Sequence, residues 1–294
     1  MPIATGEQSQ QIRRKIAFEA MSESADPVSA DALFEPDEPD VFDLINDNGS
    51  ARVLLVCDHA SRRIPARLDN LGLDELALRR HIACDIGAGD VTRRLSKMLD
   101  APALLASYSR LVIDCNRHLD DPTCILAVSD GEFVPGNHNL DPQQKALRAR
   151  NIFHPYHQGI KTRLQQFLDA GVVPALIAVH SFTPIFNRTS RPWQIGVLWD
   201  TDPRIPVPLM DKLRQIPGLV VGDNEPYSGR APADYTIDHH AEPGGLPHVS
   251  IEIRQDLINT PEGADRWANI LGRVLQEILS DEDLYSVLPM ANQT

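Results

Sequence analysis

The sequence predicts an α/β fold with a central, mostly parallel β-sheet and helices on both of its faces. From residue 51 onward, apolar runs of strand length recur, and several are nearly continuous and β-branched, as in strands buried on both sides. Segments with apolar residues at spacings of three and four lie between these runs, and such alternation of strands and helices is typical of a parallel sheet. The expected strands are residues 51–57, 102–107, 110–114, 175–180, 194–199, 218–222 and 248–253.

Four segments between or after the strands have the pattern of helices. Residues 73–85 and 89–100 are amphipathic at helical spacing. Residues 141–171 begin with Asp-Pro, a common helix start, and end at a glycine. The last expected helix spans about residues 261–279. Because the carboxyl ends of parallel strands meet at one edge of the sheet, we expect the functional residues to gather there.

The first forty residues differ in composition from the rest of the chain. Residues 1–40 are polar and acidic and have no periodic apolar face, so we expect a weakly ordered leader. Residues 41–294 are expected to form a single domain, and the 42% of hydrophobic residues in the chain supplies material for its core.

Charge and composition exclude several classes of protein. A formal net charge of −13 argues against nucleic-acid binding. No run approaches the roughly 18 apolar residues of a membrane span, and the N-terminus lacks the apolar segment of a secretory signal. The four cysteines form no CxxC pair, which favours a reduced cytoplasmic protein.

Metal-ligating residue types occur near the ends of the expected strands. His59 follows the first strand, His180 ends the fourth, and Asp85 comes from the short loop ACDIGAGD. Two histidines and a carboxylate at one sheet edge suit a zinc site with a position open for water. From the residues alone two simpler interpretations stay open, since a histidine can be a packed side chain and Asp85 can cap the helix that follows.

Glu252 interrupts the apolar run HVSIEI, where burying a carboxylate without a partner is costly. If Ile251 and Ile253 face one layer, Glu252 faces the other. Two roles are open: an ion pair with a buried arginine, or a general base beside a water activated by the metal.

Three arginines lie near the same edge and are candidates for holding a carboxylate. The planar fork of Arg110, Arg117 or Arg254 can grip a carboxylate with two hydrogen bonds, although each can also form a structural ion pair. Arg117 is the first choice because it directly follows Asn116, and together these residues point to an acidic substrate. His240, in a loop before the Glu252 strand, is a further candidate for contact with substrate.

Six motifs follow one another along the chain: VLLVCDHASRRIP, CDIGAGD, SRLVIDCNR, AVHSF, DNEPYSG and HVSIEIRQDLI. This ordered set resembles the N-formylglutamate amidohydrolase family, from about residue 51 to residue 279. That family is similar in fold to zinc carboxypeptidases and to the aspartoacylase and succinylglutamate desuccinylase group, which share a mixed sheet with a metal at its edge.

The resemblance implies roles for several residues. His59 and His180 match the two histidine ligands of one zinc ion, and Glu252 matches the glutamate base. The Asn-Arg pair in IDCNR matches the element that binds the substrate carboxylate. The implied reaction is hydrolysis of N-formyl-L-glutamate to formate and L-glutamate, so the expected partner is a small acidic N-acyl amino acid.

The sequence departs from the carboxypeptidase-like pattern at one ligand. In that pattern a glutamate follows the first histidine by three positions, whereas Arg62 occupies that place here. Asp85 is therefore the best candidate for the acidic ligand.

Three other functions compete with this interpretation. The metal enzyme could act on another N-acyl amino acid or a small peptide. A cysteine hydrolase could be built on Cys57 or Cys115. A metal-free binding module could have kept the fold without the chemistry.

Overall fold

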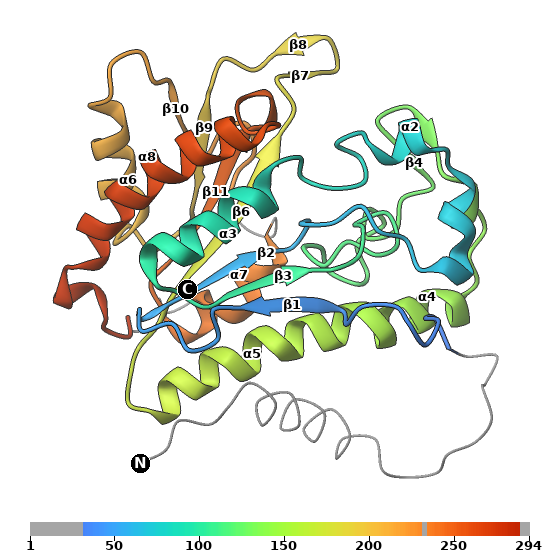
Figure 1. Cartoon of the computed structure of the whole chain (residues 1–294), viewed down its shortest axis with the longest axis horizontal. Helices are drawn as coiled ribbons and strands as arrows, with labels where there is room; N and C mark the ends of the chain where they lie inside the picture. Colours follow the sequence, from blue (N-terminus) through green and yellow to red (C-terminus); the bar gives the residue numbers. More distant parts are fainter. Residues whose placement is uncertain (1–31, 231–233, 289–294) are drawn as a thin grey trace, which may run out of the picture. The chain divides into compact units, whose positions relative to one another are not determined.

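A seven-stranded mixed sheet, in the order β1-β3-β2-β6-β11-β9-β10, forms the centre of the protein (Figure 1). The computed structural model describes residues 32–230 and 234–288. All neighbouring strands run parallel except β1 beside β3 and β11 beside β9. The mostly parallel sheet predicted from the sequence is therefore confirmed. Its strands are β1 (Phe42–Ile45), β2 (Val53–Cys57), β3 (Ala103–Ala106), β6 (Ala175–Phe182), β9 (Ile195–Leu198), β10 (Val221–Asp223) and β11 (His248–Arg254).

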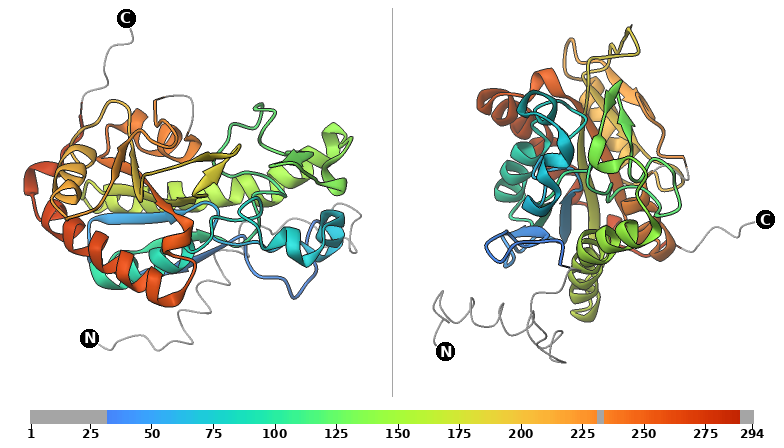
Figure 2. Two further views of the ribbon diagram at one scale, coloured as in Figure 1. Left: turned by 90° about the horizontal axis from the view of Figure 1, so that it is seen from above. Right: turned by 90° about the vertical axis from the view of Figure 1, so that its right-hand side faces the viewer.

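Helices cover both faces of the sheet (Figures 1 and 2). One apolar core lies between the sheet and helices α5 (His154–Asp169) and α7 (Tyr235–His240). The second core lies under α3 (Ala88–Leu99), α6 (Pro206–Arg214) and α8 (Pro261–Leu279). None of the helices within the described ranges is both long enough and apolar enough to span a bilayer.

Apart from 3₁₀-helical segments, the remaining elements are short. They are α2 (Glu75–Leu78), α4 (Pro142–Arg148), a π-helical turn (Ala149–Phe153) that joins α4 to α5, and the two hairpins β4 (Val128–Ser129) with β5 (Glu132–Phe133) and β7 (Ile185–Phe186) with β8 (Thr189–Ser190).

Alternation of side chains along the strands places the polar residues on one face. Successive strand residues point to opposite faces of a sheet. Leu54 and Val56 of β2 pack into the core under α5, so Asp58, two residues further, continues on that side. In β11, Ile251 and Ile253 pack under α8, which leaves Glu252 on the opposite face, as the alternation predicted.

Residues 110–114 were expected to form a strand, and this prediction is wrong. The segment is a buried turn in which the backbone N–H of Val112 donates to the carbonyl oxygen of Ser109 at 3.0 Å. The Ser109 hydroxyl donates to the carbonyl oxygen of Ala83 at 2.6 Å and accepts from the N–H of Leu111 at 3.1 Å. Apolar side chains are buried here without strand pairing, and an apolar run alone does not distinguish the two cases.

The helix expected over residues 73–85 is also much shorter than predicted. It begins after Asp74, whose side chain accepts from the N–H of Ala77, and ends at Leu78. The N–H of Asp85 donates instead to the carbonyl oxygen of His59 at 3.0 Å. This tertiary hydrogen bond holds the Asp85 loop at the end of β2. In a helix that continued to residue 85, this N–H would be used within the helix instead.

The end of the predicted leader packs against the core. Leu33 is buried, and the Phe34 ring stacks on Tyr108 with ring centres 4.8 Å apart. The Tyr108 hydroxyl donates to the carbonyl oxygen of Pro39 at 2.9 Å. Residues 1–31, the rest of that prediction, lie outside the described residues.

These contacts predict that two shortened chains differ in stability. A chain starting at Val41 loses the burial of Leu33, and full burial of a leucine is worth about 1.5–3 kcal/mol. A chain starting at Ala32 keeps all of these contacts. Denaturant unfolding should therefore show a lower free energy of unfolding for the first chain than for the second, with the site residues intact in both. Equal stabilities would contradict the packing of residues 33–40.

Candidate active site

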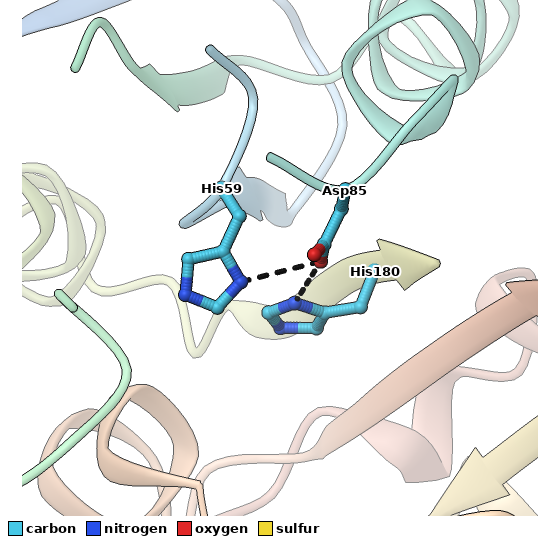
Figure 3. Close-up of side chains that lie close together, drawn as sticks. All are labelled: His59, Asp85 and His180. Carbon is cyan, nitrogen blue, oxygen red and sulfur yellow. Dashed lines mark hydrogen bonds and ion pairs between the residues drawn. The ribbon is translucent and has the colours of Figure 1, made fainter. Parts of the chain in front are cut away.

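Three buried side chains from separate segments converge at one point (Figure 3). His59 follows β2, Asp85 precedes α3, and His180 belongs to β6. Oδ2 of Asp85 lies 3.2 Å from Nδ1 of His59 and 2.9 Å from Nδ1 of His180. One potential ligand atom from each residue lies within 4.8 Å of the other two. The convergence expected from the strand ends is therefore present.

A second carboxylate backs each imidazole. Nε2 of His59 lies 2.7 Å from Oδ1 of Asp114, and Nε2 of His180 lies 3.3 Å from Oδ2 of Asp58. Both aspartates are buried. A carboxylate on the far nitrogen fixes the orientation of a ligating histidine and directs its other nitrogen toward the metal. Neither aspartate was predicted from the sequence as a site residue, although each lies at the end of an apolar run.

The electrostatics of the three residues follow from this arrangement. Burial alone would lower the pKa of His180, but contacts with Asp58 and Asp85 raise it well above its usual value. Burial and Arg110 would lower the pKa of His59, but the contacts with Asp114 and Asp85 have the larger effect. The pKa of His59 is therefore raised above its usual value. Burial would raise the pKa of Asp85, yet the two imidazoles hold it below its ordinary value.

The donor set fits a metal ion. Two imidazole nitrogens and one carboxylate oxygen, all aimed at one point, are a combination used by catalytic zinc sites with a fourth position open. The Asp85 carboxylate favours positive charge between the two imidazoles, because both Nδ1 atoms face its Oδ2. A divalent cation can take the place of the two Nδ1 protons.

Gly87 sets the course of the loop that carries Asp85. Its φ angle is +80°, and a Cβ atom there would lie 2.1 Å from the carbonyl oxygen of Ile258. Gly87 is also the N-cap of α3, which has no side-chain cap. Asp85 therefore does not cap the helix, the simpler role that the sequence had left open.

Arg110 links two of the carboxylates. Its guanidinium donates to Oδ2 of Asp114 at 2.5 Å and to Oδ1 of Asp85 at 3.4 Å. It thus bridges the metal-ligand candidate Asp85 and the carboxylate that orients His59. Although Arg110 lines the cavity described below, two of its hydrogen bonds are used within the protein.

A cavity of about 400 Å³ adjoins the three residues, and Glu252 forms part of its wall. Glu252 is the parallel-strand partner of His180 and is buried. Within the described part of the chain its Oε2 has no hydrogen-bond partner and the carboxylate makes no ion pair, so the alternative of a structural ion pair is not observed. Burial raises the pKa of Glu252 to about 7. Besides the three converging residues, the other polar residues that line the cavity are Arg110, Asn116, Arg117, Ser181, Tyr227, Ser228, Arg230, Asp234 and Ser250.

The structure separates the predicted substrate-binding residues into two groups. Asn116 and Arg117 line the cavity, and Oδ1 of Asn116 accepts from the N–H of Thr236 at 2.9 Å. Arg254 and His240 do not line it. Arg254 forms an ion pair with Asp256 at 2.8 Å, and Nε2 of His240 lies 3.0 Å from Nδ1 of His157.

Tyr227, Ser228 and Arg230 are among the lining residues that were not selected from the sequence. They belong to or directly follow the motif DNEPYSG, which entered the prediction only through the family resemblance. Their common signal is a polar cluster in the loop after β10.

The cysteines offer poor nucleophiles. Cys57 and Cys115 are free, buried thiols. Burial raises the pKa of each well above its ordinary value. Because the thiolate is the nucleophilic form, a cysteine hydrolase built on either residue is disfavoured.

Comparison with known proteins gives the same assignment as the motifs. The N-formylglutamate amidohydrolase family model matches residues 51–259. A crystal structure of a gene product from Agrobacterium tumefaciens is similar over 85% of this chain and 98% of that one, with 33% identity and a TM-score of 0.81. The structure of N-formylglutamate amidohydrolase from Ralstonia eutropha JMP134 is similar in fold over 81% of this chain and 96% of that one, with 19% identity and a TM-score of 0.65. No curated protein matches the sequence.

The family match covers the described site from His59 to Glu252 and most of the sheet. We conclude that the chain belongs to the N-formylglutamate amidohydrolase family.

Proposed function

We propose that the protein is a zinc-dependent amidohydrolase that converts N-formyl-L-glutamate into formate and L-glutamate. The observation that carries this proposal is the convergence of His59, Asp85 and His180 beside a cavity whose wall also holds the buried carboxylate of Glu252. The family supports the amide-hydrolysing chemistry and the class of substrate.

His59, His180 and Asp85 would hold the metal ion, with Asp114 and Asp58 orienting the two imidazoles. When bound, zinc polarises an acyl oxygen and lowers the pKa of a water molecule to about 7. This ligand assignment is supported by the burial and spacing of the donor atoms.

Glu252 is proposed as the general base and acid. Its buried carboxylate takes a proton from the attacking water and returns it to the nitrogen of the leaving amine, so that the amide bond is replaced by a carboxylic acid and a free amine. A pKa near 7 suits both steps, because the group can accept and release a proton at neutral pH.

Asn116 and Arg117 are proposed to bind a substrate carboxylate at the cavity wall. The cavity volume of about 400 Å³ lies within the usual range for small-molecule sites and suits an N-acyl amino acid. The four free thiols are in keeping with the cytoplasmic location predicted from the sequence.

The proposal predicts one zinc ion per chain, which depends on the three ligands. Elemental analysis of protein purified without chelators should find one equivalent of zinc in the wild type and little in Asp85→Asn, His59→Ala or His180→Ala. Asp58→Asn should weaken zinc affinity by roughly 10–100-fold in competition with a chelating dye, since it removes the partner of one ligating imidazole. His154→Ala, an exposed histidine, serves as the control.

Two results would contradict the metal assignment. One is a folded wild type that contains no stoichiometric metal yet hydrolyses N-formyl-L-glutamate. The other is full zinc content in Asp85→Asn. A panel of N-formyl, N-acetyl and N-succinyl amino acids then tests the substrate, and the highest kcat/KM is expected for N-formyl-L-glutamate.

Changing Glu252 to Gln tests the general base. The amide keeps the size of the side chain but cannot accept the proton, so kcat should fall by roughly 10²–10⁴-fold while zinc content and KM stay near wild type. Glu262→Gln, an exposed change in the first turn of α8, should leave kcat unchanged. If Glu252→Gln instead loses its zinc, Glu252 is a ligand; if kcat is unaffected, the proposed proton transfer is wrong.

A further inference from the structure

A buried arginine, Arg191, packs behind the cavity wall. Arg191 is only 8% exposed, and its guanidinium carbon lies 4.8 Å, 4.9 Å and 5.8 Å from the ring centres of Phe186, Tyr227 and Phe182. Among residues 32–230 and 234–288 no carboxylate forms an ion pair with it. Burying a cation in this way is costly, and contact with aromatic faces offsets only part of that cost.

The guanidinium makes a hydrogen bond that constrains Tyr227. Nη1 of Arg191 donates to Oη of Tyr227 at 3.0 Å and contacts the carbonyl oxygen of Thr183 at 3.4 Å. Because a guanidinium only donates, the phenol oxygen must be the acceptor. The Tyr227 O–H is then left to donate elsewhere, and no acceptor for it is found in the described part of the chain.

Tyr227 is 43% exposed and lines the same cavity as Glu252, on a loop whose backbone is hydrogen-bonded near the end of β9. Oδ1 of Asn224 accepts from the N–H groups of Trp199 at 3.1 Å and of Gly229 at 2.8 Å. The loop packs so closely on β9 that a Cβ atom at Gly196 would lie 2.0 Å from the carbonyl oxygen of Glu225.

Gly196 is also the antiparallel partner of Glu252 in the sheet. The loop that carries Tyr227 therefore packs against the strand next to the proposed general base. The electrostatics agree with this placement: partial burial and the Glu252 carboxylate raise the pKa of Tyr227, whereas Arg191 and Arg110 act in the opposite direction.

We propose that Tyr227 is a catalytic residue that donates its phenolic O–H to the acyl oxygen of the substrate, and that Arg191 is the positioning residue that aims and polarises this donor. The inference rests on the proposed function. Tyr227 breaks and forms no covalent bond; its hydrogen bond strengthens as negative charge develops on the acyl oxygen. A donor whose orientation is set before the reaction has the greatest effect on the transition state.

Tyr227→Phe removes only the hydroxyl and is the primary test. Loss of one such donor typically lowers kcat by about 10²–10³-fold, and because the interaction forms mainly in the transition state, KM should change by less than about twofold. Tyr285→Phe is the matched control, since the guanidinium carbon of Arg52 lies 3.7 Å from the Tyr285 ring centre in a pair that does not line this cavity. It should leave kcat unchanged.

Substitution of Arg191 tests the positioning role with a readout that does not depend on turnover. Arg191→Met keeps an apolar side chain against the aromatic rings but removes the donor. The ¹³Cζ resonance of Tyr227, assigned by its absence in Tyr227→Phe, should shift in the substrate-free protein, and kcat should fall. Arg191→Lys keeps the cation and should recover part of kcat.

Each unfavourable result has a definite meaning. A normal kcat in Tyr227→Phe, or a raised KM with kcat unchanged, overturns the catalytic role, and the second result would make Tyr227 a carboxylate-binding residue. An unchanged Tyr227 resonance in Arg191→Met overturns the role of Arg191. If the wild type hydrolyses its substrate and Tyr227→Phe is normal, only this inference fails. If the wild type hydrolyses no N-acyl amino acid, the proposed function fails together with it.

Discussion

The contact of Asp85 Oδ2 with Nδ1 of both His59 and His180 is the interaction on which the site depends. It joins a loop, the end of one strand and the interior of another, which are far apart in the sequence. Each imidazole is held from behind by a second buried carboxylate, and Arg110 bridges two of the acidic groups. Such a concentration of buried charge is stable only if each member keeps its partners, so removing one is expected to disturb the others.

The sheet explains why the chemistry is confined to one face. Alternation along β2, β6 and β11 directs apolar side chains into two cores, and the polar residues at the same strand ends emerge on the side of α5 and α7. The antiparallel pairing of β11 with β9 brings Gly196 beside Glu252 and lets the loop after β10 pack against that strand. Glu252, the metal-ligand candidates and Tyr227 thus share one cavity because of the strand order.

The sequence predicted buried strands and long amphipathic helices well, because burial on both faces and helical periodicity leave direct patterns, as in the final helix Pro261–Leu279. It failed at residues 110–114 and 73–85, where tertiary hydrogen bonds override local pattern. The place of Glu252 at the site was predictable, because it is a carboxylate within an apolar run. The contacts of Asp58, Asp114 and Tyr227 were not predictable, since they depend on which side chains the fold brings together. Arg254 and His240 were expected at the site but lie outside the cavity.

X-ray absorption at the zinc edge of the purified, full-length protein tests the His59, Asp85 and His180 site, because it reports the atoms around the metal. We predict one zinc ion with two imidazoles and only nitrogen and oxygen among its ligands, at about 2.0–2.2 Å. A sulfur atom at about 2.3 Å from the zinc would assign the metal to cysteine instead. That result, or a first shell without imidazole, would contradict a site built on His59, Asp85 and His180.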